Sequence, residues 1–101
     1  MADIKILLIE DEDLEAKDIK QTFESFDYWS FICRIQWRRS YHKARKIRTD
    51  IILMHIYFKW NIINVIDVAT KIKELDIPII FLISHSKSPK NQNIGTIWLY
   101  N

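Results

Sequence analysis

Two groups of side chains in this sequence can do chemistry, and each is tied to a short apolar run. The acidic run 10–13 (EDED) comes directly after the apolar letters IKILLI, and His55 lies near the end of a second run, IILMHI. Imidazole nitrogen and carboxylate oxygen are both donor atoms that transition-metal ions bind. The simpler interpretation of the acids is a charged helix start, because a helix N-terminus favours carboxylates, with Asp11 or Asp13 as N-cap.

A third group of side chains is basic. Residues 28–49 contain no acid. They carry Arg34, Arg38, Arg39, Lys43, Arg45, Lys46 and Arg48. A helix predicted over 38–48 can therefore contact the phosphates of a nucleic acid, although a solvated outer helix face has the same composition. We favour the solvated face and keep nucleic-acid binding as the alternative function.

Composition excludes several classes of protein. Gly95 is the only glycine, so glycine-rich phosphate loops are excluded. Cys33 is the only cysteine, which excludes a disulfide framework and a cysteine-based zinc site and fits a reducing cytoplasm. The acidic start does not resemble a signal peptide, and no apolar run is long enough to span a membrane. We expect a single cytoplasmic domain over 1–101 that does not act at a membrane.

The elements that must position these side chains alternate between strands and helices. The continuous apolar runs are typical of strands buried on both faces, and strand–helix–strand order predicts a parallel sheet in an α/β fold with three layers. The pattern predicts strands at 4–9, 31–37 (an edge strand), 50–56, 78–83 and 94–100, helices at 14–26, 38–48 and 62–75, and a polar loop at 85–93.

Three stretches resemble the receiver domain of two-component response regulators. KILLIEDE is similar to that family's first strand and acidic cluster, DIILMHIYF to the phosphoacceptor strand, and IPIIFLISHS to the fourth strand with its hydroxyl switch residue. The resemblance covers nearly the whole chain. It implies a doubly wound, flavodoxin-like parallel sheet of order 2-1-3-4-5, with the site at the carboxyl ends of the strands.

The chain departs from the family pattern at the positions that handle phosphate. The phosphoacceptor Asp of the family is replaced by His55. The hydroxyl switch position falls on Ile83, with Ser84 beside it, and the position of the family's phosphate-contacting Lys falls on Leu99. The match that remains is the acidic pair Glu10 and Asp11, which implies at most a weak remnant Mg²⁺ site. No other cofactor is implied.

His55 cannot form the acyl phosphate that a carboxylate gives, so we expect phosphorylation at the usual site to be abolished. Three uses of His55 remain open. It can accept a phosphoryl group itself, bind a transition metal with Glu10 and Asp11, or fill the acidic pocket as an ion-paired imidazole. We favour the ion pair.

The sequence thus predicts a degenerate receiver domain that is no enzyme and is either a phosphorylation-independent interaction module or vestigial. The resemblance implies a sensor histidine kinase or another response regulator as partner. Relative to the family, the loop 85–93 replaces the fourth helix, and the last helix is lacking. We therefore expect apolar side chains of the first, third and fifth strands to lie open on one sheet face, where homo-oligomers can form.

Overall fold

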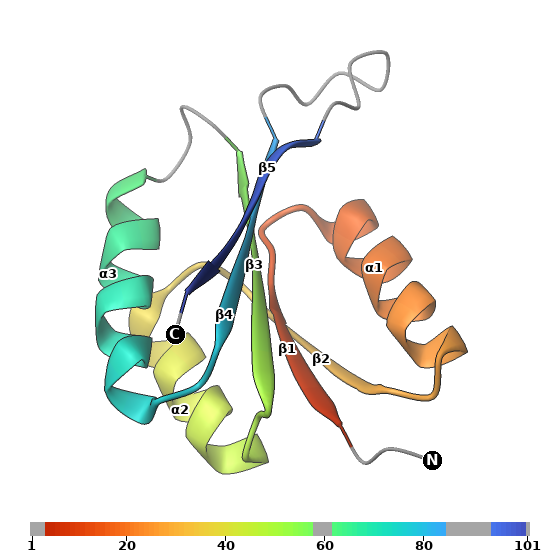
Figure 1. Ribbon diagram of the computed structural model, residues 1–101, viewed down its shortest axis with the longest axis horizontal. Helices are drawn as coiled ribbons and strands as arrows, with labels where there is room; N and C mark the ends of the chain where they lie inside the picture. The colour runs from red at the N-terminus through yellow and green to blue at the C-terminus, as the bar shows by residue number, and fades with distance from the viewer. Residues whose placement is uncertain (1–3, 58–61, 85–93, 101) are drawn as a thin grey trace.

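Three apolar runs form the central strands of one sheet in the computed structural model, which describes residues 4–57, 62–84 and 94–100. For residues 57, 62–64, 84 and 94–100 this description covers the backbone alone. The elements in chain order are β1 (Lys5–Ile9), α1 (Asp13–Ser25), β2 (Trp29–Cys33), α2 (Trp37–Ile47), β3 (Ile51–Tyr57), α3 (Ile62–Ile72), a 3₁₀ turn (Lys73–Leu75), β4 (Ile79–Ser84) and β5 (Ile94–Tyr100) (Figure 1).

The sheet has the order β2-β1-β3-β4-β5, and β1 to β4 are mutually parallel. β1 lies between β2 and β3, so its last four residues, from Ile6 to Ile9, are all buried. This confirms the expectation that continuous apolar runs mark strands covered on both faces. β2 lies at the edge of the sheet as predicted, but it ends at Cys33 rather than at Trp37.

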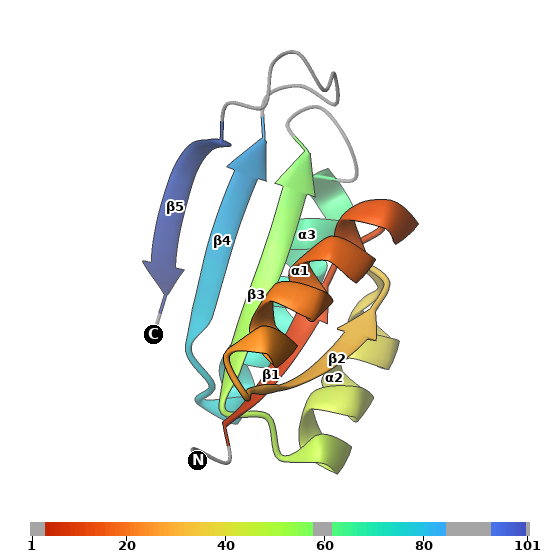
Figure 2. The same cartoon turned by 90° about the vertical axis from the view of Figure 1, so that its right-hand side faces the viewer.

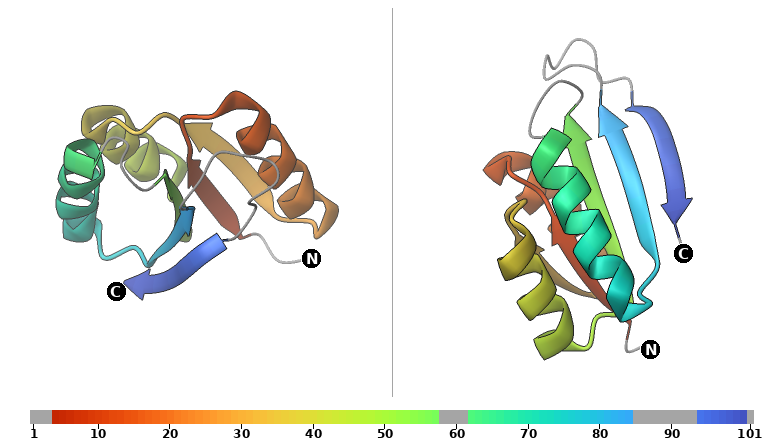
Figure 3. Two further views of the ribbon diagram at one scale, coloured as in Figure 1. Left: turned by 90° about the horizontal axis from the view of Figure 1, so that it is seen from above. Right: turned by 90° about the vertical axis from the view of Figure 1, so that its left-hand side faces the viewer.

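The expectation of an all-parallel sheet is wrong for the fifth strand, because β5 pairs with β4 in the antiparallel direction. Figures 2 and 3 show β5 pointing against its neighbours. The physical reason is the length of the connection. A parallel pair needs a crossover of about a dozen residues or more, usually a helix, and the segment 85–93 has nine residues.

The helices divide between the two faces of the sheet. α2 and α3 pack side by side on one face, and α1 covers the other alone (Figures 1 and 3). The main core lies between the sheet and the helix pair. It consists of Leu7, Ile9, Cys33, Ile35, Ala44, Ile52, Met54, Ile56, Val65, Val68, Ile72 and Ile79. We call this side the two-helix face and the other side the one-helix face.

The one-helix face is less open than expected from the sequence. Ile6 and Leu8 of β1 are 6% and 0% exposed, so the expectation that the first strand lies open is wrong. α1 lies next to β2 and brings the buried Ala16 toward the sheet. Farther from α1, Leu53, Ile80 and Leu82 are half-buried. The side chains of the fifth strand lie outside the described residues.

Candidate functional site

The start of the acidic run and His55 meet because β1 and β3 are parallel neighbours. Ile9 pairs with Met54, so the next residues, Glu10 and His55, stand at the same level at the carboxyl end of β1. Met54 and Ile56 both belong to the core of the two-helix face. Since side chains alternate along a strand, His55 between them points to the one-helix face.

His55 and Glu10 form a buried pair. Nδ1 of His55 lies 2.5 Å from Oε1 of Glu10, and their side chains are only 5% and 0% exposed. The second oxygen of Glu10, Oε2, accepts a hydrogen bond from the backbone N–H of Glu12 at 3.1 Å. Removal from water costs a carboxylate several kcal/mol, so these hydrogen bonds are needed to hold Glu10 in place.

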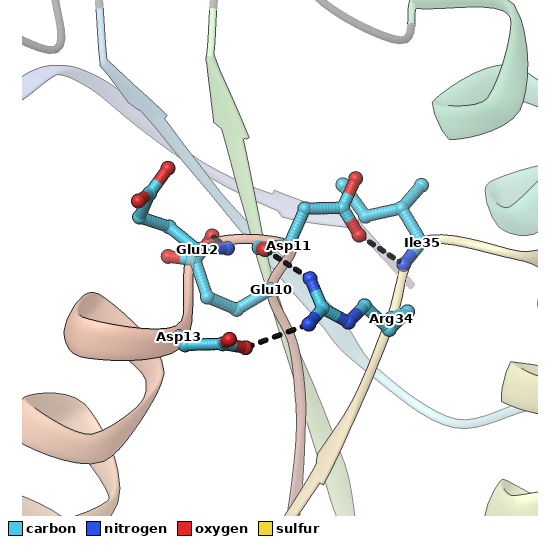
Figure 4. A network of polar contacts seen from close by, with 6 residues as sticks. All are labelled: Glu10, Asp11, Glu12, Asp13, Arg34 and Ile35. Carbon is cyan, nitrogen blue, oxygen red and sulfur yellow. Dashed lines mark hydrogen bonds and ion pairs between the residues drawn. The ribbon is translucent and has the colours of Figure 1, made fainter.

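Asp11 points away from this pair. Its Oδ1 accepts a hydrogen bond from the backbone N–H of Ile35 at 2.7 Å, on the connection between β2 and α2 (Figure 4). The predicted metal set of His55, Glu10 and Asp11 is therefore not brought together in the described geometry. A Mg²⁺ site that uses Glu10 and Asp11 stays a prediction.

Arg34 ties the start of α1 to the same connection. Its guanidinium donates to the backbone carbonyl of Asp11 and, at 2.8 Å, to the carboxylate of Asp13 (Figure 4). The predicted capping of this helix by Asp11 or Asp13 is wrong, because the N-cap is Glu12, which makes no side-chain capping bond. The two aspartates instead hold Ile35 and Arg34, so the acidic run links neighbouring loops.

Glu15 joins the site, and the sequence analysis missed it. One donor atom from each of Glu10, Glu15 and His55 lies within 4.8 Å of the other two, and in the described part of the chain no other such group of three occurs. Glu15 is exposed in the first turn of α1, directly before the buried Ala16. That position next to an inward-facing residue is the signal that could have identified it.

Two of the predicted switch positions, Ile83 and Leu99, do not lie beside His55. Ile83 pairs with Ile56 and packs against the core of the two-helix face, so it points away from His55. Leu99 pairs with Ile80, because antiparallel β5 carries it toward the opposite end of the sheet. The expected place of Leu99 beside the site is therefore wrong. The side chain of Ser84 lies outside the described residues.

The basic helix presents one coherent face. Arg39, His42, Lys43 and Lys46 follow the spacing i, i+3, i+4, i+7 and line a shallow hollow against β2, which Arg34 also borders. Lys43 donates to the backbone carbonyl of Ile32 at 2.7 Å. Other basic residues pack on aromatic rings, Arg38 on Trp37 and Arg45 on Tyr41. The hollow is thus the place where this helix can meet an anion.

Neither the described helices nor the comparisons with known proteins give a further indication of function. None of the helices in the described segments is long and apolar enough to cross a membrane. Comparison of the chain with models of protein families, with curated proteins and with solved structures found no match.

Proposed function

We propose that this chain is a receiver-like domain of cytoplasmic phosphorelay signalling that acts by binding partners, without phosphorylation at the usual site. The observation that carries the proposal is the buried pair of His55 and Glu10 at the carboxyl ends of β3 and β1. By resemblance, these are the positions of the phosphoacceptor and of an acidic partner. The parallel arrangement of β1 to β4, with helices on both faces, supports the same proposal.

The pair explains why phosphorylation is not expected. An imidazole cannot form an acyl phosphate, and the 2.5 Å contact with Glu10 occupies the place where a phosphoryl group and its Mg²⁺ would be held. Ile83 offers no hydroxyl to a phosphoryl oxygen. A sensor histidine kinase or another response regulator is the partner that the resemblance implies.

The test is intact-mass measurement after incubation with acetyl phosphate and Mg²⁺, on the wild type and on His55→Asp. We expect no adduct on the wild type and a base-labile adduct of one phosphoryl group on His55→Asp, because the variant restores a carboxylate beside Glu10. His42→Asp is the matched control, since it changes an exposed histidine of α2 in the same way.

Each other outcome has a definite meaning. An acid-labile phosphoryl group on the wild type would make His55 itself the acceptor and would contradict the proposal. Equal labelling of His55→Asp and His42→Asp would show that the added carboxylate reacts regardless of the site. If neither variant is labelled, the site no longer supports a receiver-like function.

Self-association through the one-helix face is part of this proposal. Leu53, Ile80 and Leu82 are half-buried apolar side chains on neighbouring strands, and a sheet normally has both faces covered. We expect light scattering to report a mass above that of the monomer at high protein concentration, and Leu82→Lys to lower it. A monodisperse monomer across the concentration range would contradict this part.

A second candidate function is binding of a polyanion such as a nucleic acid, and it is favoured by the hollow on α2. Four basic side chains share one helix face there. When a protein binds through phosphate contacts, the logarithm of its binding constant falls linearly with the logarithm of salt concentration. If this candidate is right, heparin should retain the chain in a salt-dependent way, and Arg39→Gln with Lys46→Gln should abolish retention. The double variant Arg38→Gln with Arg45→Gln, which removes two positive charges outside the hollow, is the charge-matched control.

A further inference from the structure

We infer that Glu10, Glu15 and His55 form a binding site for a divalent transition-metal ion of the zinc class. The inference rests on the positions of these three side chains and does not depend on the proposed signalling role. Their donor atoms come from β3, from the residue that follows β1 and from α1, and each lies within 4.8 Å of the other two. Elements far apart in the sequence therefore converge on one point.

The donor types select the class of ion. Imidazole nitrogen together with carboxylate oxygens suits zinc, nickel, cobalt or iron, whereas Mg²⁺ strongly prefers oxygen alone. Three protein donors also match the number that zinc takes when a fourth position is left for water or another ligand. A site that contains His55 therefore favours a transition metal over Mg²⁺.

The geometry requires only small side-chain movements. Donors at about 2.0–2.2 Å from a tetrahedral ion are about 3.4 Å from one another. The contact between His55 and Glu10, at 2.5 Å, must open slightly, and Glu15 must approach. Glu15 can do so because it is exposed, while the backbone of α1 is held at this point by the buried Ala16.

The charge balance favours a cation. A divalent ion compensates the carboxylates of Glu10 and Glu15 together. The neighbouring acidic run adds further negative charge, of which Asp13 is paired with Arg34. The N-terminal end of α1 opposes a cation, and Glu15 lies in its first turn, so the two carboxylates must outweigh this effect.

The test is isothermal titration calorimetry of the untagged, metal-free protein with Zn²⁺. We expect one Zn²⁺ per chain in the wild type. Glu15→Gln should weaken binding at least about tenfold, because loss of a group that merely orients a ligand already costs about 10–100-fold. Glu15 is the informative position, since it is exposed and its substitution leaves the buried pair intact.

The matched control is Asp11→Asn, which removes one carboxylate of the same acidic segment and keeps an oxygen acceptor for Ile35. It should leave the Zn²⁺ affinity within about threefold of the wild type, since a nearby charge that is no ligand acts only through a screened interaction. A larger loss in Asp11→Asn than in Glu15→Gln would overturn the assigned ligand set.

Visible absorption of bound Co²⁺ provides the second measurement. Intense bands between the blue and the red are expected for a low-coordinate Co²⁺ in the wild type, and they should weaken in Glu15→Gln and remain in His42→Ala. The inference is overturned if the wild type shows no saturable binding of either ion. It is equally overturned if His42→Ala, an exposed histidine elsewhere, abolishes binding while Glu15→Gln does not.

Discussion

Along β3 the side chains point alternately to the two faces of the sheet, and the two sets differ in type and in burial. Ile52, Met54 and Ile56 on the two-helix face are at most 6% exposed. Leu53 on the one-helix face is half-buried, and His55 at the end of the same row is paired with a carboxylate. The comparison indicates that dense aliphatic packing on one face leaves the other free to hold ionisable groups.

The largest effect should come from Ile52→Ala, with Leu53→Ala as the matched substitution on the opposite face. Ile52 is 0% exposed, so its truncation should lower the free energy of unfolding by about 2–5 kcal/mol. Leu53 has the same volume but is half-buried, so about 1–2 kcal/mol is expected from its partial burial. Urea denaturation measures both. Equal losses would show that the two faces are packed alike.

The next effect should come from the polar pair of the one-helix face. Glu10→Gln and His55→Gln each leave a buried group with a poorer partner, so each should cost about 1–3 kcal/mol of unfolding free energy. Because the two side chains are in contact, the double variant should lose less than the sum of the two, with a coupling of about 0.5–3 kcal/mol. Additive losses would mean that the contact contributes little to stability.

Much of this fold could be predicted from the sequence. The apolar runs that became β1, β3 and β4 identified the central strands of the sheet, and the helices between them followed from their periodicity. The direction of β5 was not predicted, because the family resemblance was followed at a place where the nine-residue connection argued against it. Connection length was the stronger physical constraint.

The site was predicted in part. The meeting of Glu10 with His55 depends on the register of two parallel strands, which the resemblance supplied. The contact of Asp11 was not predicted, because its hydrogen bond to the N–H of Ile35 is a tertiary contact with no sequence signature. Glu15 was missed because an acid in a first helical turn is ordinarily a surface residue.

A third test compares the two alanines at which helices approach the sheet. Ala44 of α2 is 0% exposed and Ala16 of α1 is 3% exposed. Ala44→Leu should cost about 1–3 kcal/mol, because α2 is confined by α3 and the core and cannot move aside. Ala16→Leu should cost less, since α1 has no neighbouring helix in the described part of its face. Thermal unfolding ranks the two, and the reverse order would contradict the comparison.

The smallest effect should come from Arg34→Gln, which breaks the link between the start of α1 and the connection that leads to α2. The side chains of Arg34 and Asp13 are 54% and 78% exposed, and exposed ion pairs contribute about 0–1 kcal/mol. We therefore expect a loss below about 1 kcal/mol in urea denaturation at low salt, and less at high salt because exposed charges are screened. Asp13→Asn is the control, since it removes the ion pair while the bond of Arg34 to the carbonyl of Asp11 remains. A loss that is large and independent of salt would mean that Arg34, rather than the packing around Ala16, holds α1 in position over the one-helix face.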